Sequence, residues 1–170
     1  MIIIILSLYI ILQLALPANL FLFNIRPDLL LVLTVFIGLF NLRGGLLFSA
    51  SLGLIKDIFS LGPFGLNIFS LSLWVIIARA LSRQIYRDNK FIYLLLVAAA
   101  TGLNHLIYFL VNNFLSKNSL AFSGFFFVTI LLETIYNSLF AYMLFGIFKA
   151  YPSKVLGWPI LLDYSNFSLS

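Results

Sequence analysis

The chain has 170 residues, of which 63% are hydrophobic and only 9% are charged. A soluble domain carries about a quarter of its residues as charged groups, and a domain of this size cannot bury so much apolar surface. The composition therefore excludes a water-soluble domain and predicts one compact, all-α integral membrane domain.

The first apolar run, Ile2–Leu22, is predicted to be an uncleaved membrane span, because it lacks a basic leader and exceeds the about 7–15-residue core of a signal peptide. The stretch Asn24–Asp28 (NIRPD) is predicted to be a turn, since the residue before Pro27 disfavours helix. Asp28 then begins a helix, where a carboxylate suits the positive end of the helix dipole. Arg26 beside it is a candidate headgroup anchor.

Further along the chain, charges and Gly, Pro and Asn clusters separate five more apolar runs. These are predicted as the helices Leu29–Leu42, Leu46–Phe59, Leu66–Leu81, Phe91–Asn112 and Phe122–Phe148, which makes about six spans. The first three of them are shorter than the roughly 20 residues that cross a bilayer. The second and third of these runs therefore either cross with polar ends drawn inward or form a re-entrant hairpin, which is tolerated only when buried in protein. One membrane domain is expected over residues 1–150, followed by a short cytoplasmic tail over 151–170.

The basic residues set the predicted orientation. Arg79, Arg83, Arg87 and Lys90 make the strongest basic loop, which the positive-inside rule places in the cytoplasm. With six spans, both the N-terminus and the C-terminus then lie in the cytoplasm of a multi-pass membrane protein.

The run Leu46–Phe59 carries a small-residue face that ends in a charge. Gly45, Ser49, Gly53 and Asp57 recur every four residues, a spacing that places them along one side of a helix and lets another helix approach closely. We predict a packed seam that ends in a carboxylate aimed into the protein and includes Gly65 beyond the turn. In the simpler interpretation, the helix end reaches the headgroups and Lys56 snorkels toward them.

Two polar stripes mark the last two runs. They consist of Thr101, His105, Tyr108 and Asn112 on one and Thr129, Glu133, Tyr136 and Asn137 on the other. The runs are joined by a short loop and lie antiparallel, so His105 and Glu133 are at similar depth, and we predict that they pair or share a polar pocket. A structural hydrogen bond between helices is favoured over a proton relay, because one acidic residue and one histidine are few groups for a proton-transfer pathway.

Motifs for catalysis or cofactor binding are lacking in this sequence. There is no cysteine and only one histidine, so a zinc site is not expected, and no HExxH, P-loop or GxGxxG pattern occurs. We predict no enzyme activity and no cofactor. Nucleic-acid binding is not expected either, because the net charge of +5 comes from basic residues that cluster between apolar runs.

Four short motifs carry a resemblance to a known family. They are Arg26-Pro27-Asp28, Arg43-Gly44-Gly45, Gly53-x3-Asp57 and Gly62-Pro63-x-Gly65-Leu66. With these motifs the chain resembles the MreD family, membrane proteins of the bacterial complex that elongates the cell wall. The resemblance implies a non-enzymatic role with the partners MreC, MreB, RodA and a class B penicillin-binding protein. It also implies similarity to the S-component, the substrate-binding subunit, of ECF (energy-coupling-factor) vitamin transporters, which are small six-span proteins.

Three classes of function are therefore compared. A membrane scaffold of the rod-shape complex, regulating cell shape with an MreC-like protein, predicts no turnover and a requirement for that partner. A small-molecule-binding subunit of a transporter predicts a polar pocket on the outer side, which His105, Glu133, Asn67 and Asn104 are placed to line. A membrane enzyme is disfavoured by the lack of catalytic motifs.

Overall fold

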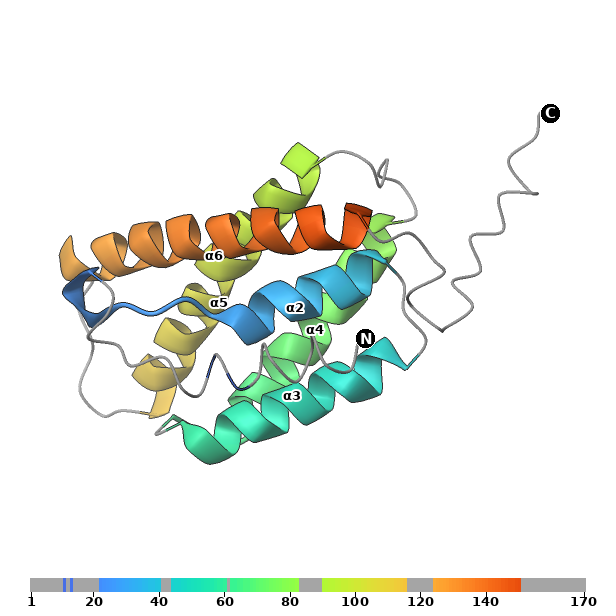
Figure 1. The fold of residues 1–170 in the computed structure, drawn as a ribbon. Helices are drawn as coiled ribbons and strands as arrows, with labels where there is room; N and C mark the ends of the chain where they lie inside the picture. The colour runs from blue at the N-terminus through green and yellow to red at the C-terminus, as the bar shows by residue number, and fades with distance from the viewer. Residues whose placement is uncertain are drawn as a thin grey trace.

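A computed structural model describes residues 11, 13, 22–40, 44–60, 62–82, 90–115 and 124–150 of the chain. This part is helical and contains no strand, as Figure 1 shows. Its elements are the 3-10 helix η2 (Leu22–Asn24) and the α-helices α2 (Leu29–Leu39), α3 (Gly45–Phe59), α4 (Leu66–Ser82), α5 (Lys90–Leu115) and α6 (Gly124–Ala150). The predicted helical class is confirmed for these residues. The predicted span Ile2–Leu22 falls almost wholly outside the described residues, and so does the tail 151–170.

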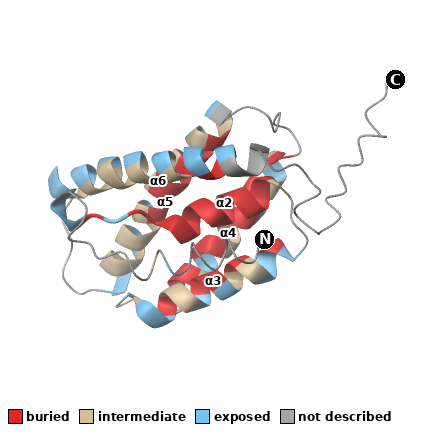
Figure 2. Ribbon diagram, in the orientation of Figure 1, coloured by how far each residue is buried: buried red, intermediate tan, exposed pale blue. Residues whose placement is uncertain are grey.

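Helix α2 forms the centre of the bundle. Its sequence, LLLVLTVFIGL, is apolar on every side, which is the pattern of a helix buried all round. All of its residues are buried, and Figure 2 shows it as a continuous buried rod with the other helices around it. It contacts α3, α4, α5 and α6. The hydrophobic core accordingly runs along α2 and includes Leu71 and Trp74 of α4 and Val97 of α5.

The segment that leads into α2 differs from the predicted turn. Left-handed backbone occurs at its beginning, at Phe23 and Asn24, whose φ angles are 56° and 59°. Residues 25–28 then run without regular structure from the end of the bundle into its interior (Figure 1). Ile25, Pro27 and Asp28 are buried there. The start of α2 therefore lies inside the protein rather than at its edge.

The remaining helices form two antiparallel pairs, α3 with α4 and α5 with α6, that enclose α2. Within the described residues, Phe91–Leu115 and Gly124–Gly146 are long and apolar enough to cross a membrane. Leu29–Leu39 and Leu66–Ser82 are apolar but shorter. An 11-residue helix is about 16 Å long, roughly half of a hydrocarbon core, so α2 needs the irregular segment before it to reach the same end of the bundle as its neighbours.

Candidate functional site

The small-residue face of α3 packs against α4 and α2. A Cβ atom added at Gly53 would lie 2.5 Å from Cα of Ile68 and 2.7 Å from the carbonyl oxygen of Asn67, so the two helix backbones touch here. A Cβ atom at Gly45 would lie 2.7 Å from Cγ2 of Ile37 on α2. Ser49, between the two glycines, is completely buried. Only residues with little or no side chain permit this approach.

Asp57 closes this face by capping α4. Its Oδ1 accepts hydrogen bonds from the backbone amide and the side-chain amide of Asn67, at 3.1 and 2.7 Å. Its Oδ2 accepts from the amides of Gly65 and Ile68, at 3.0 and 3.2 Å. Gly65 has a φ of +92°, which a residue with a side chain rarely adopts and which helps to turn its amide toward the carboxylate. Asp57 thus satisfies the free amides of the first turn of α4 from the neighbouring helix.

A track of polar side chains continues from α4 to α5. Asn67 accepts a hydrogen bond from the hydroxyl group of Tyr108, and Ser70 donates one to Asn104. Asn67, Ser70 and Asn104 are buried, so these bonds replace water inside the bundle. Asn104 and Tyr108 are four residues apart and so lie on one side of α5, toward α4.

The start of α2 is held by charged and polar groups from three other segments. Asp28 accepts from the amide of Leu31 at 3.2 Å, which caps α2, and it also forms an ion pair with Lys56. The amide of Asp28 donates to Oδ1 of Asn137 on α6 at 2.8 Å. The amide of Leu29 donates to Oε1 of Gln13 at 2.8 Å. These contacts satisfy the backbone where it leaves regular structure in the protein interior.

His105 and Glu133 join α5 to α6. Nε2 of His105 lies 2.7 Å from Oε2 of Glu133. One turn away on the two helices, the side-chain amide of Asn137 donates to the hydroxyl oxygen of Thr101 at 2.9 Å. Thr101 and His105 therefore face α6, whereas Asn104 and Tyr108 face α4. The single predicted stripe on α5 is divided between two neighbouring helices.

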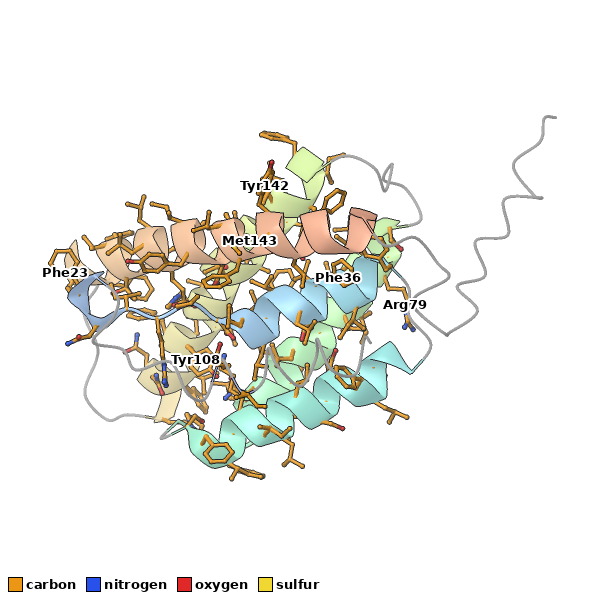
Figure 3. The ribbon with its side chains drawn as sticks, viewed as in Figure 1. Phe23, Phe36, Arg79, Tyr108, Tyr142 and Met143 are labelled. Atoms are coloured by element: carbon orange, nitrogen blue, oxygen red, sulfur yellow. The ribbon has the colours of Figure 1, made fainter. Side chains whose placement is uncertain are left out.

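Asp28, Lys56 and Glu133 border a cavity toward one end of the bundle. Its volume is about 420 Å³, and its lining comes from four parts of the chain: Gln13, Arg26, Pro27, Asp28, Leu30, Lys56, Phe59, Ser60 and Glu133. Tyr108 is linked to Asp57 through Asn67, and Asp28 and Glu133 both line the cavity. Figure 3 shows Tyr108 near the start of α2 and Arg79 at the opposite end of the bundle.

Two sequence interpretations need correction. Lys56 does not snorkel away from the protein, because its ammonium group pairs with Asp28 of α2. Asn67 and Asn104 are not among the residues that line this cavity, and their side chains bond instead to Asp57, Tyr108 and Ser70. Of the four residues proposed to line a pocket, Glu133 does so.

Sequence reasoning missed two contributors. A Cβ atom at Gly38 would lie 2.6 Å from Cβ of Ala78 and 2.8 Å from the carbonyl oxygen of Val75, so α2 and α4 also meet through a glycine. A lone glycine inside an apolar helix is the signal that pointed to this contact. Gln13, a polar residue in the middle of the first apolar run, was the signal for the contact with Leu29.

The sequence pattern of one family, described as rod shape-determining protein MreD, matches residues 1–155. The chain belongs to the MreD family. The match covers nearly the whole chain and extends well beyond the four motifs near residues 26–67. No match was found to a protein of curated function or to a solved structure. Membership in MreD therefore rests on sequence, and it makes this chain a rod shape-determining membrane protein.

Proposed function

We propose that this MreD protein is a non-enzymatic scaffold in the bacterial cytoplasmic membrane. It would assemble with an MreC-like protein and, through the rod-shape complex, with MreB, RodA and a class B penicillin-binding protein. The family match over residues 1–155 is the observation that carries the proposal. Both ends of the chain would lie in the cytoplasm, as the basic loop at residues 79–90 predicts.

The polar residues bond to other parts of the same chain, which supports the scaffold function. Asp57, Asn67 and Asn104 bind other parts of the same chain, so the seam between α3 and α4 stabilises the fold and is not free for a partner. The outer surface is apolar, and Leu131, Ile135 and Leu139 of α6 are each more than half exposed. A partner's transmembrane helix would therefore meet an apolar face, where shape rather than charge selects the contact.

A second function has one specific observation in its favour. The cavity of about 420 Å³ has the size of small-molecule sites and carries several charged side chains. A small-molecule-binding membrane subunit of a transporter, of the vitamin-binding type, would use such a cavity. It would also require ATPase subunits, which the scaffold would not.

The two functions differ in what purifies with the protein. We would express the tagged chain in a rod-shaped bacterium that lacks its own MreD, extract it in mild detergent and identify bound proteins by mass spectrometry. The scaffold predicts an MreC-like protein and restored rod shape. ATPase subunits together with a small ligand, and no MreC-like protein, would overturn the scaffold.

Surface variants then locate the contact without disturbing the fold. Leu139→Trp on α6 and Leu110→Trp on α5 change side chains that are 58% and 57% exposed, so each adds bulk at a surface position of equal accessibility. Loss of the partner in one variant alone assigns the contact to that helix. Asp57→Leu is unsuitable here, because that carboxylate accepts four hydrogen bonds within the fold.

A further inference from the structure

The charged cavity contains groups that the fold itself leaves without a partner. Asp28 and Lys56 neutralise each other. Arg26 lines the same cavity, is exposed, and has no ion pair or hydrogen bond to any residue that the structure describes. A guanidinium group remains charged at any physiological pH. The cavity therefore holds one cation with its full hydrogen-bonding capacity unused.

Glu133 provides a matching anion. Its Oε2 is bonded to Nε2 of His105, but its Oε1 has no hydrogen-bond partner within the described part of the chain. One carboxylate oxygen of Glu133 is therefore available to a donor in the cavity. The Glu133 side chain is only 14% exposed.

The position of the cavity makes these unpaired groups costly. The amide of Asp28 bonds to Asn137, which lies near the middle of α6 (Gly124–Ala150), and Glu133 is about one turn from Asn137. The cavity therefore lies alongside the membrane-spanning helices rather than beyond their ends. Charges at such depth carry a free-energy cost unless they are paired or reach water. A ligand with one positive and one negative group would pair with both Arg26 and Glu133 in this cavity.

We propose that this cavity binds a zwitterion with a phosphate and a primary ammonium group, as in phosphoethanolamine. The fork of Arg26 donates to the phosphate, with the ammonium of Lys56 close by, and Oε1 of Glu133 accepts from the ligand's ammonium. Phe59, which also lines the cavity, is 67% exposed and offers an apolar contact for an attached acyl chain. This site is independent of the scaffold function and requires no partner protein.

Native mass spectrometry of the delipidated, detergent-solubilised full chain tests the site. The protein is titrated with phosphatidylethanolamine, phosphatidylglycerol, which lacks the ammonium, and phosphatidylcholine, whose ammonium has no N–H donor. We expect phosphatidylethanolamine to bind at least about tenfold more tightly than either of the others. Free phosphoethanolamine is added as a competitor. Displacement at similar concentrations identifies a soluble ligand, whereas binding of the lipid alone identifies a headgroup site, and either result supports the proposed chemistry.

Three variants assign the roles of the residues. Arg26→Gln should weaken binding of both phosphatidylethanolamine and phosphatidylglycerol by about tenfold, and Glu133→Gln should lower phosphatidylethanolamine to the level of phosphatidylglycerol. Arg79→Gln, at the other end of the bundle, removes the same charge and should change neither affinity. Equal binding of the three lipids by the unaltered protein, or unchanged binding in Arg26→Gln, would overturn the proposal. If Glu133→Gln fails to fold, the lipid series on the unaltered protein still decides the outcome.

Discussion

At the scale of single residues, Asp57 and Gly53 act together. Gly53 brings the backbones of α3 and α4 into contact, and Asp57, one turn later, binds the amides that open α4. The cap depends on the contact, because the carboxylate reaches those amides only where the helices are close. The pattern Gly53-x3-Asp57 therefore encodes a helix contact and a helix cap in one turn of sequence.

Replacing Gly53 with alanine should separate these two helices. The new Cβ would lie within 2.7 Å of three backbone atoms of α4, which cannot move independently, so the free energy of unfolding should fall by about 1–3 kcal/mol. The measurement is chemical unfolding in detergent micelles followed by circular dichroism.

Gly102→Ala is the matched control for this experiment. Gly102 lies within α5, and an added Cβ there meets no atom within 4 Å. The substitution should be neutral or slightly stabilising, because alanine favours helix over glycine by about 1 kcal/mol. Equal loss of stability in both variants would show that the close approach of α3 and α4 at Gly53 does not cause the destabilisation of Gly53→Ala.

At the scale of the secondary-structure element, α2 is a short helix that begins inside the protein. Such a start is tolerated because Asp28 caps it and because Asn137 and Gln13 accept the amides of Asp28 and Leu29. The ion pair with Lys56 adds a link from α2 to α3. Four separate segments of the chain therefore converge on one helix end.

The free energy of unfolding should fall more when one partner of this ion pair is removed than when both are removed. Lys56→Met leaves Asp28, whose side chain is 6% exposed, without a counter-charge, and should lower the free energy of unfolding by about 3 kcal/mol. Adding Asp28→Asn removes that charge while keeping a residue that caps helices well, so the double variant should regain stability. Unfolding titrations of both proteins make the comparison. A double variant as unstable as Lys56→Met would mean that the charge of Asp28 is not what Lys56 compensates.

At the scale of the whole molecule, polar and ionic groups gather at one end of an apolar bundle. The cavity, the cap of α4 and the contact between His105 and Glu133 all lie in the region around Tyr108, away from Arg79 (Figure 3). If the basic loop at residues 79–90 faces the cytoplasm, the cavity lies toward the outer side of the membrane. Ligands would then enter it from outside the cell.

This orientation can be measured by cysteine labelling, because the native sequence contains no cysteine. Gln84→Cys tests the basic loop, and Ser119→Cys tests the connection between α5 and α6. We expect a membrane-impermeant maleimide, added to intact cells stripped of any outer barrier, to label Ser119→Cys and to spare Gln84→Cys. Labelling of both after membrane lysis is the control. The reverse pattern on intact cells would invert the proposed topology.

The sequence by itself determined the class of the protein, its helices and its family. Low charge and long apolar runs specify helices in a bilayer, and the helix limits from α2 to α6 agree with the predicted runs to within three residues at each end. The spacing of Gly45, Ser49, Gly53 and Asp57 also predicted one face of α3, because local periodicity decides which residues share a side of a helix.

Only the tertiary structure decided which partner each polar residue binds. Lys56 is adjacent to Asp57 in sequence, yet it pairs with Asp28, and the polar residues of α5 divide between α4 and α6. Such choices depend on the rotation and depth of helices that are far apart in the chain, which no local pattern records. The cavity arises for the same reason, since its walls come from segments as distant as Gln13 and Glu133, and it exists only once those segments have packed together.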